Sequence, residues 1–83
     1  GVRMNAVAPG YTRTPMTQQI EEDPTYGPAI KEFVASIPVG RAGLPEDIAN
    51  AVHFLLGPKG SFICGSVLFV DGGHDAQFRP DQV

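Results

Sequence analysis

The spacing of apolar and polar residues predicts one strand near the start of the chain and another toward its end. Apolar residues take alternate positions over residues 2–8, which is the period of a strand with one covered face. Residues 67–70 form an unbroken apolar run between glycine-containing turns. Such a run is typical of a strand that is covered on both faces in a parallel sheet. We therefore predict a strand at each of these two segments.

Between the two strands the spacing changes to that of helices. Residues 16–22 predict a short helix that follows a loop. Residues 28–36 predict an amphipathic helix. Its apolar residues recur at the intervals i, i+3, i+4 and i+7: Ile30, Phe33, Val34 and Ile37. The order strand, helices, strand predicts an α/β fold whose two strands run parallel.

The clearest helix of the sequence spans residues 45–56. Pro45 suits the first helical position, two carboxylates follow it in the first turn, and Gly57 ends the helix. Phe54 lies off the apolar stripe of this helix, beside Asn50. The side chain of Phe54 could contact a partner, or it could be a single exposed aromatic side chain on the surface. The pattern leaves both interpretations open.

The composition limits the kinds of protein that this chain can be. Its 83 residues allow at most one domain and are too few for a complete dinucleotide-binding or barrel enzyme, so we expect a small module or part of a larger protein. The net charge is −3 and the six basic residues are scattered, which argues against a nucleic-acid surface. No apolar stretch is long enough to cross a membrane, and the single cysteine cannot form an internal disulfide. We expect a cytoplasmic protein without membrane or nucleic-acid partners.

The loop after the first predicted strand is the candidate binding site. Ligands of open α/β sheets bind beyond the carboxyl ends of the strands, and Pro9 and Gly10 stand at such an end. Gly10 would let the backbone approach a ligand closely, and hydroxyls at Thr12 and Thr14 can hydrogen-bond an amide or a phosphate. The alternative is that Pro9 and Gly10 form only a turn and that the threonines only cap the next helix.

Three segments, in this order, resemble the short-chain dehydrogenase/reductase family. The sequence VRMNAVAPG at residues 2–10, followed by Thr14, resembles the family's penultimate strand and its Pro-Gly-x-x-x-Thr loop. Residues 40–49 resemble its late helix with the preceding Gly-Arg, and FICG through VDGG at residues 62–73 resembles its last strand and turn. The resemblance runs from residue 1 to about residue 75.

The resemblance implies a fold and an activity. Residues 1–83 would be the C-terminal portion of a single Rossmann-like domain, with residues 74–83 as a C-terminal tail. This portion would hold the last two strands of a doubly wound parallel sheet, the substrate-loop helices and the late helix. The activity would be hydride transfer between NAD or NADP and a small-molecule carbonyl or alcohol.

The resemblance also implies roles for the residues after the first strand. The backbone near Thr12 would hold the nicotinamide carboxamide, and Thr14 would bond the carboxamide or the pyrophosphate. Pro9 and Gly10 would shape the nicotinamide pocket.

On the substrate side, the resemblance places Tyr11, Met16 and Phe33 in the pocket. Within the family, the DPTYG segment at residues 23–27 and the Arg-Pro of residues 79–80 resemble the bacterial 3α-hydroxysteroid dehydrogenase/carbonyl reductase branch. The substrate stays open between a bulky hydrophobic carbonyl or alcohol and a generic ketone, sugar or oxoacyl compound.

The catalytic Tyr-x-x-x-Lys motif of the family does not occur in this sequence. Tyr11 is followed four positions later by Pro15, and Tyr26 by Ile30. We therefore assign no catalytic residue to this chain and expect the isolated chain to be inactive.

Family members commonly pair through the late helix and the last strand. We therefore expect a homo-oligomer formed through the helix at residues 45–56 and the strand at residues 66–71. The alternative to an enzyme fragment is a non-catalytic binding or interaction module derived from the same fold.

The remaining polar residues and the cysteine predict no further site. One cysteine and two distant histidines do not have the spacing of a metal site. We expect Cys64 to be a small buried residue, His74 to lie on a loop surface rather than at the pocket, and Asp71 to order a turn.

Overall fold

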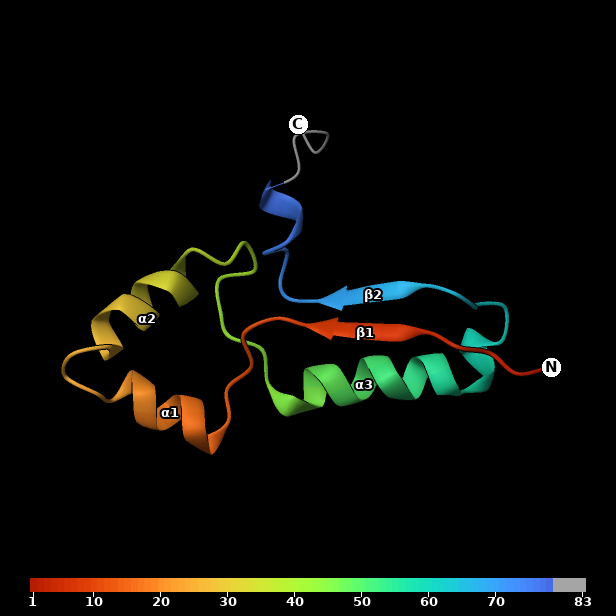
Figure 1. Ribbon diagram of the computed structural model, residues 1–83, viewed down its shortest axis with the longest axis horizontal. Coiled ribbons are helices and arrows are strands. Elements are labelled where there is room, and N and C mark those ends of the chain that lie inside the picture. The colour runs from red at the N-terminus through yellow and green to blue at the C-terminus, as the bar shows by residue number, and fades with distance from the viewer. Residues whose placement is uncertain (79–83) are drawn as a thin grey trace.

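Two parallel strands lie at the centre of the fold, as Figure 1 shows. The computed structural model describes residues 1–78, so residues 79–83 of the predicted tail, with the Arg-Pro pair, lie outside the described residues. The elements in chain order are β1 (Ala6–Pro9), α1 (Pro15–Glu21), α2 (Gly27–Ala35), α3 (Pro45–Leu56), the 3-10 turn η1 (Pro58–Gly60), β2 (Val67–Val70) and the 3-10 turn η2 (Ala76–Phe78).

The parallel pairing of β1 and β2 confirms the predicted α/β arrangement. Ala6 pairs with Val67 at the start of the ladder, and Pro9 pairs with Val70 at its end. Pro9 is tolerated there because the bond to Val70 comes from the N–H of Gly10, so the missing N–H of the proline faces away from β2. The first strand therefore begins later and ends later than the predicted segment of residues 2–8.

The residues before β1 do not continue the ladder; side-chain bonds and one backbone bond, from the N–H of Gly65 to the carbonyl of Met4 at 2.8 Å, hold them. The Asn5 side chain donates to the carbonyl of Ile63 at 3.1 Å and accepts from the N–H of Ser66 at 3.0 Å. Arg3 donates from Nη1 to the carbonyls of Leu55 and Gly60 at 2.9 Å each. These bonds attach the residues before β1 to the end of α3 and to the segment between α3 and β2.

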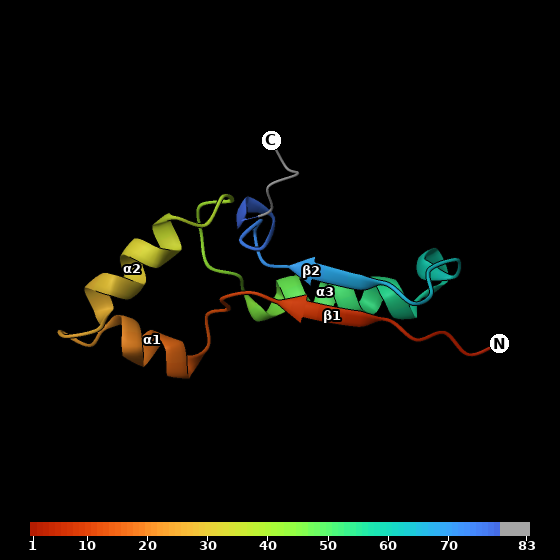
Figure 2. The ribbon, with the colours of Figure 1, turned by 45° about the horizontal axis from the view of Figure 1, so that its top comes forward.

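Helix α3 lies along one face of the strand pair, as Figures 1 and 2 show. It begins at Pro45 and ends at Leu56, as the sequence predicts. Between α3 and β1 the facing side chains are Val7, Val52 and Leu55, and Leu55 is buried.

The opposite face of the strands carries no helix among residues 1–78. Because neighbouring side chains of a strand alternate between its faces, Val67 and Phe69 point to this uncovered side. Their exposed fractions are 58% and 45%. Burial of the second strand on both faces, which the sequence predicts, is therefore not found within these residues.

Helices α1 and α2 form an arm that stands beyond the carboxyl ends of both strands (Figures 1 and 2). They pack against each other and start and stop within one residue of the predicted segments. The fold is accordingly extended: its radius of gyration is 15.3 Å. A compact domain of this length has about 12 Å.

Candidate functional site

The loop after β1 and the turn after β2 lie side by side, because parallel strands end at the same edge of a sheet. The N–H of Gly10 donates to the carbonyl of Val70 at 3.0 Å. A Cβ atom on Gly10 would lie 2.6 Å from the Cβ atom of Asp71. The absence of a side chain at Gly10 therefore makes room for the adjacent turn, whereas the sequence suggested room for a ligand.

Asp71 orders the turn that follows β2, as the sequence predicts. Its carboxylate accepts from the N–H of Gly73 at 3.0 Å and from the N–H of Asp75 at 2.9 Å. The bond from Asp75, with a smaller contribution from Gly73, holds the pKa of Asp71 below its ordinary value. Gly72 and Gly73 adopt positive φ angles of 67° and 94°, which side-chain-bearing residues rarely adopt. The turn is thus fixed by both its carboxylate and its glycines.

Thr12 is held by a backbone bridge to the connector that precedes α3. The carbonyl of Tyr11 accepts from the N–H of Gly43 at 2.9 Å, and the N–H of Arg13 donates to the carbonyl of Gly43 at 2.7 Å. In this parallel geometry the N–H and carbonyl of Thr12 itself point away from Gly43. The carbonyl accepts from the hydroxyl of Thr17 at 3.3 Å. Within residues 1–78, no hydrogen bond is found for the N–H of Thr12.

Thr14 is the N-cap of α1. Its hydroxyl accepts from the N–H of Thr17 at 3.3 Å, and the hydroxyl of Thr17 accepts from the N–H of Thr14 at 2.7 Å. This capping box agrees with the alternative interpretation of the threonines. A hydroxyl carries one donor and two acceptor positions, so capping leaves Thr14 able to form another bond. The hydroxyl of Thr12 donates to the carbonyl of Gly10 at 3.0 Å.

The loop and the arm are joined at Glu21. This carboxylate accepts from the Tyr11 hydroxyl at 3.0 Å and from two nitrogens of Arg13, at 3.2 and 3.0 Å. Burial and, next, the bond to Glu21 raise the pKa of Tyr11, while the hydrogen bonds from Arg13 are the main cause of a lowered pKa for Glu21. The network is therefore most stable with a protonated phenol and an ionised carboxylate.

Two of the three predicted substrate-side residues lie together. The rings of Tyr11 and Phe33 stand edge to face with centroids 6.0 Å apart. Met16 does not take part in this ring contact, and its exposed fraction on α1 is 70%. The sequence did not predict that His74 would join the group, because it places His74 on a loop surface. The His74 ring lies 5.2 Å from that of Phe33, and no periodic pattern marks this contact, which the turn after β2 creates.

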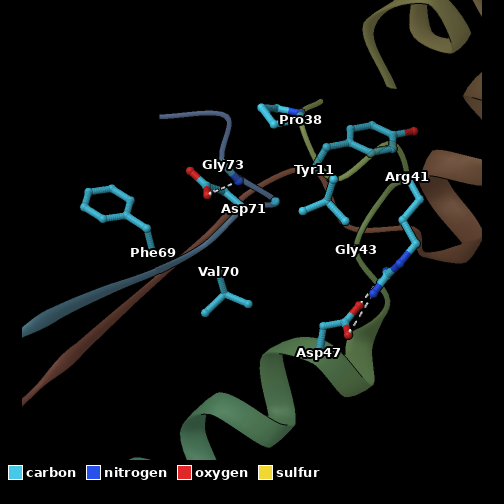
Figure 3. A pocket seen from close by; sticks show the side chains of 11 residues that line it. Tyr11, Pro38, Arg41, Gly43, Asp47, Phe69, Val70, Asp71 and Gly73 are labelled. Atoms are coloured by element: carbon cyan, nitrogen blue, oxygen red, sulfur yellow. Dashed lines mark hydrogen bonds and ion pairs between the residues drawn. The ribbon is translucent and has the colours of Figure 1, made fainter. Parts of the chain in front are cut away.

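A cavity of about 620 Å³ opens beside this group. Figure 3 shows it between the ends of the strands and the start of α3, with Tyr11 and the Arg41–Asp47 ion pair on its walls. The eleven lining residues are Tyr11, Pro38, Val39, Arg41, Gly43, Asp47, Phe69, Val70, Asp71, Gly72 and Gly73. Of the seven predicted site residues, Tyr11 alone lines it; Pro9, Gly10, Thr12, Thr14, Met16 and Phe33 do not.

Neither a metal-ligand cluster nor a membrane-spanning helix is found in the described part of the chain. No three His, Cys, Asp or Glu residues gather as metal ligands within residues 1–78. No helix in the same range is long and apolar enough to span a membrane. Cys64 is exposed rather than buried, because it lies in the loop between η1 and β2 and not under a helix.

The geometry of Thr12 fits one predicted ligand group. A primary carboxamide has an N–H donor and a carbonyl acceptor. The outward N–H of Thr12 matches the acceptor, and the second lone pair of its carbonyl matches the donor. Both groups lie beyond the carboxyl end of β1, where α/β sheets bind ligands.

Comparison with known proteins gives matches over almost the whole chain. A family model described as enoyl-(acyl carrier protein) reductase matches residues 1–75. The 3α-hydroxysteroid dehydrogenase/carbonyl reductase of Comamonas testosteroni is 44% identical over 82 residues, which are 99% of this chain and 31% of that protein. The 3α-hydroxysteroid dehydrogenase of Mediterraneibacter gnavus is 49% identical over 71 residues, which are 86% of this chain and 26% of that protein. The chain thus spans less than a third of the length of these curated relatives.

Solved structures agree with this fold. The 3α-hydroxysteroid dehydrogenase of Pseudomonas sp. B-0831, complexed with NADH, is 53% identical, with a TM-score of 0.74 over 93% of this chain and 30% of that one. A protein from Agrobacterium tumefaciens with bound NADP is 41% identical, with a TM-score of 0.76 over 92% of this chain and 30% of that one. The α/β unit described above therefore has the arrangement of a Rossmann-like sheet with a late covering helix. Because the family model covers residues 1–75, the chain belongs to the short-chain dehydrogenase/reductase family.

Proposed function

We propose that this chain is the C-terminal portion of an NAD(P)-dependent oxidoreductase that transfers a hydride between its cofactor and a carbonyl or alcohol substrate. In this proposal residues 9–14 are the nicotinamide-side loop, and the α1–α2 arm covers the substrate. One observation carries the proposal: the bridge to Gly43 leaves the N–H of Thr12 pointing outward at the carboxyl end of β1. The relatives solved with NADH and NADP support the same cofactor class.

The cofactor would be NAD or NADP, and its nicotinamide would supply the hydride. Thr12 would bind the carboxamide through its backbone N–H and carbonyl. Thr14 would add a bond from its hydroxyl to the carboxamide or the pyrophosphate while it caps α1. Pro9 and Gly10 would act indirectly, since they bring this loop against the turn at Asp71.

The proton donor for the carbonyl would lie outside this chain. The sequence has no Tyr-x-x-x-Lys, and the phenol of Tyr11 is bonded to a carboxylate. We therefore propose no catalytic residue here and expect the isolated chain to be inactive. We also propose a cytoplasmic location, because a single cysteine argues against a disulfide-stapled secreted domain.

The substrate would be a small carbonyl or alcohol compound. The matched relatives include steroid, galactitol and oxoacyl enzymes by their names, so a family match alone does not choose among these classes. The rings of Tyr11 and Phe33 offer an apolar wall at the arm, which suits a substrate with an apolar part.

The test uses the protein made from the complete reading frame that encodes this chain. We expect oxidation of NADH or NADPH, followed at 340 nm, with at least one carbonyl from a panel of a steroid ketone, a 3-oxoacyl thioester and a keto sugar. The 83-residue chain alone should be inactive with each. The proposed oxidoreductase function would be overturned if the complete reading frame lacked a glycine-rich phosphate turn and a Tyr-x-x-x-Lys motif, or if its protein showed no turnover. Either result would favour the non-catalytic binding module.

Two variants of Thr12 test which of its groups holds the cofactor. Thr12→Val keeps the backbone N–H and removes the hydroxyl, so the Kd for the cofactor should stay within about twofold. Thr12→Pro removes the N–H, and the Kd should rise by about tenfold or more. Equal affinity in the Pro variant, with its fold intact by circular dichroism, would argue against the proposed binding mode.

The protein is also proposed to self-associate through α3 and the strand at residues 66–71. The apolar side chains that remain exposed on these elements are Val52, Phe54, Leu56, Val67, Leu68 and Phe69. Helices from the remainder of the protein would cover the open face of the strand pair. The free edge of β2 and Phe54 on the outer side of α3 would meet a second copy. Exposed apolar area of this kind is typical of protein interfaces.

A further inference from the structure

Glu21 occupies a distinctive position between the arm and the strand-end loop. It ends α1, yet its side chain turns back to residues eight and ten positions earlier in the chain. The Glu21 side chain is 14% exposed, and that of its partner Arg13 is 37% exposed. An ion pair along one helix face joins residues three or four positions apart, so this contact is a tertiary link and not a local helix pair.

The Glu21 carboxylate has three donors. Oε2 accepts from the Tyr11 hydroxyl at 3.0 Å and from Nε of Arg13 at 3.2 Å, and Oε1 accepts from Nη2 of Arg13 at 3.0 Å. Two parallel bonds from a guanidinium fix the plane of a carboxylate, because both groups are flat and rigid. The oxygen that receives the phenol therefore has a defined place, and so has the phenol.

The fixed phenol belongs to a ring that contacts two parts of the site. Tyr11 lines the cavity at the strand ends, and its ring stands edge to face with Phe33 of α2. Phe33 in turn contacts the ring of His74, in the turn after β2. Rotation of Tyr11 away from Glu21 would open this ring contact and change the wall that faces a bound substrate.

We infer that Glu21 is a positioning residue for the substrate side of the site: it holds Tyr11, through the phenol hydroxyl, so that the ring forms a fixed wall for the apolar part of a carbonyl substrate. The inference rests on the proposed function. It assigns to Glu21 no contact with substrate or cofactor, and its effect is on substrate affinity rather than on the hydride step.

The kinetic test compares variants of the protein from the complete reading frame, with the best carbonyl of the panel. Glu21→Ala should raise KM for the carbonyl roughly five- to tenfold, with kcat and the Kd for NAD(P)H within about twofold. Glu21→Gln keeps one oxygen that accepts from the phenol but loses one of the two bonds from Arg13, so it should recover only part of the affinity. Glu22→Ala is the matched control: it removes an adjacent, exposed carboxylate and should behave as the unchanged protein.

Tyr11→Phe separates positioning from general stability. It keeps the ring and removes the hydroxyl that Glu21 holds, so it should also raise KM. In the Tyr11→Phe background, Glu21→Ala should have little further effect, because the bond that it breaks is already absent. Tyr11→Phe and Glu21→Gln, each compared with the unchanged protein, carry the test if Glu21→Ala proves too unstable to purify.

A direct readout follows the phenol itself. The NMR signal of the Tyr11 ring carbon that bears the hydroxyl, assigned by its loss in Tyr11→Phe, should shift in Glu21→Ala and not in Glu22→Ala. The inference is overturned if this signal does not move in Glu21→Ala, or if Glu21→Ala and the control Glu22→Ala change KM equally. It is also overturned if the effects of Glu21→Ala and Tyr11→Phe on KM are additive. A protein that shows no turnover before any substitution overturns the proposed function as well, whereas an active protein with these negative results overturns the positioning role alone.

Discussion

Gly10 and Asp71 are in contact where the two parallel strands end, and no side chain fits at Gly10. A Cβ atom there would lie 2.6 Å from the Cβ and 2.7 Å from the Cα of Asp71. The same glycine donates its N–H to the carbonyl of Val70 at 3.0 Å. The loop proposed to bind the cofactor is thereby set against the turn after β2 by backbone contact, and its position depends on Gly10.

Gly10→Ala should therefore destabilise the protein. Added atoms in a closely packed place force shifts that typically cost about 1–3 kcal/mol, and here the obstacle includes backbone of the adjacent turn. We expect a lower midpoint of thermal unfolding in the protein from the complete reading frame. Gly43→Ala is the control, since a Cβ atom there would be 3.4 Å from the nearest atom, the Tyr11 carbonyl oxygen. Equal midpoints for the two variants would contradict the contact.

The carboxylate of Asp71 should make stability depend on pH in the acid range. Its pKa lies below the ordinary value of 3.8, because the bonds from Asp75 and Gly73 favour its ionised form. The unfolded chain then binds the proton more readily than the folded one. The ionised Asp71 therefore adds its full contribution to the free energy of unfolding above about pH 4, and this contribution is lost as the pH falls through the pKa of the folded state. Denaturant unfolding from pH 5 to pH 2 should show a weaker acid dependence in Asp71→Asn than in the unchanged protein. Parallel curves would mean that these bonds add no stability.

Local signals in the sequence were sufficient for the helix at residues 45–56. Pro45, the carboxylates after it and Gly57 mark the ends of α3 by their own backbone preferences, so its bounds did not depend on the rest of the chain. The start of β1 was harder to predict, because the residues with strand periodicity before Ala6 do not continue the ladder. The side chains of Arg3 and Asn5 and the carbonyl of Met4 hold them instead. Alternation alone does not distinguish these two cases.

The candidate site could be predicted only as far as its loop. The sequence predicted a binding loop at residues 9–14, but the bridge between Thr12 and Gly43 joins segments far apart in the chain and has no periodic signal. The contact of Phe33 with His74 likewise depends on the path of the turn after β2. The exposure of Cys64 has the same origin, since an apolar residue type does not show whether another element covers it.

Arg3 should stabilise the far end of α3. Its Nη1 donates to the carbonyl of Leu55, in the last turn of α3, at 2.9 Å, and the last carbonyls of a helix otherwise lack partners. It also donates to the carbonyls of Gly60 and Ile63, after the helix, at 2.9 and 3.2 Å. Arg3→Met keeps an apolar stem and removes these bonds, which should lower the free energy of unfolding by about 1–3 kcal/mol. Hydrogen exchange should become faster at the amides of η1. Lys59→Met, which removes an exposed charge from η1 itself, should have little effect on either measurement.

Phe54 should contribute to the proposed self-association. It is 43% exposed on the outer side of α3, next to a shallow hollow that Asn50 and Pro58 line. A buried aromatic anchor at an interface typically contributes about 2 kcal/mol or more, so Phe54→Glu should shift the protein to a smaller species in sedimentation velocity. Phe54→Leu keeps an apolar side chain and should retain most of the larger species. A protein that stays the same size with glutamate at this position would place its interface elsewhere.

Thr14 offers a test that separates its capping role from its proposed contact with the cofactor. An aspartate is as good an N-cap as threonine and favours the positive end of the helix dipole, so Thr14→Asp should keep α1 and the thermal midpoint. The same carboxylate would repel a pyrophosphate and should raise the Kd for NAD(P)H by about tenfold or more. Thr14→Ser keeps both functions, whereas Thr14→Ala loses the cap, at a cost of about 1 kcal/mol, together with the hydroxyl. An Asp variant with unchanged cofactor affinity would leave Thr14 with the cap alone.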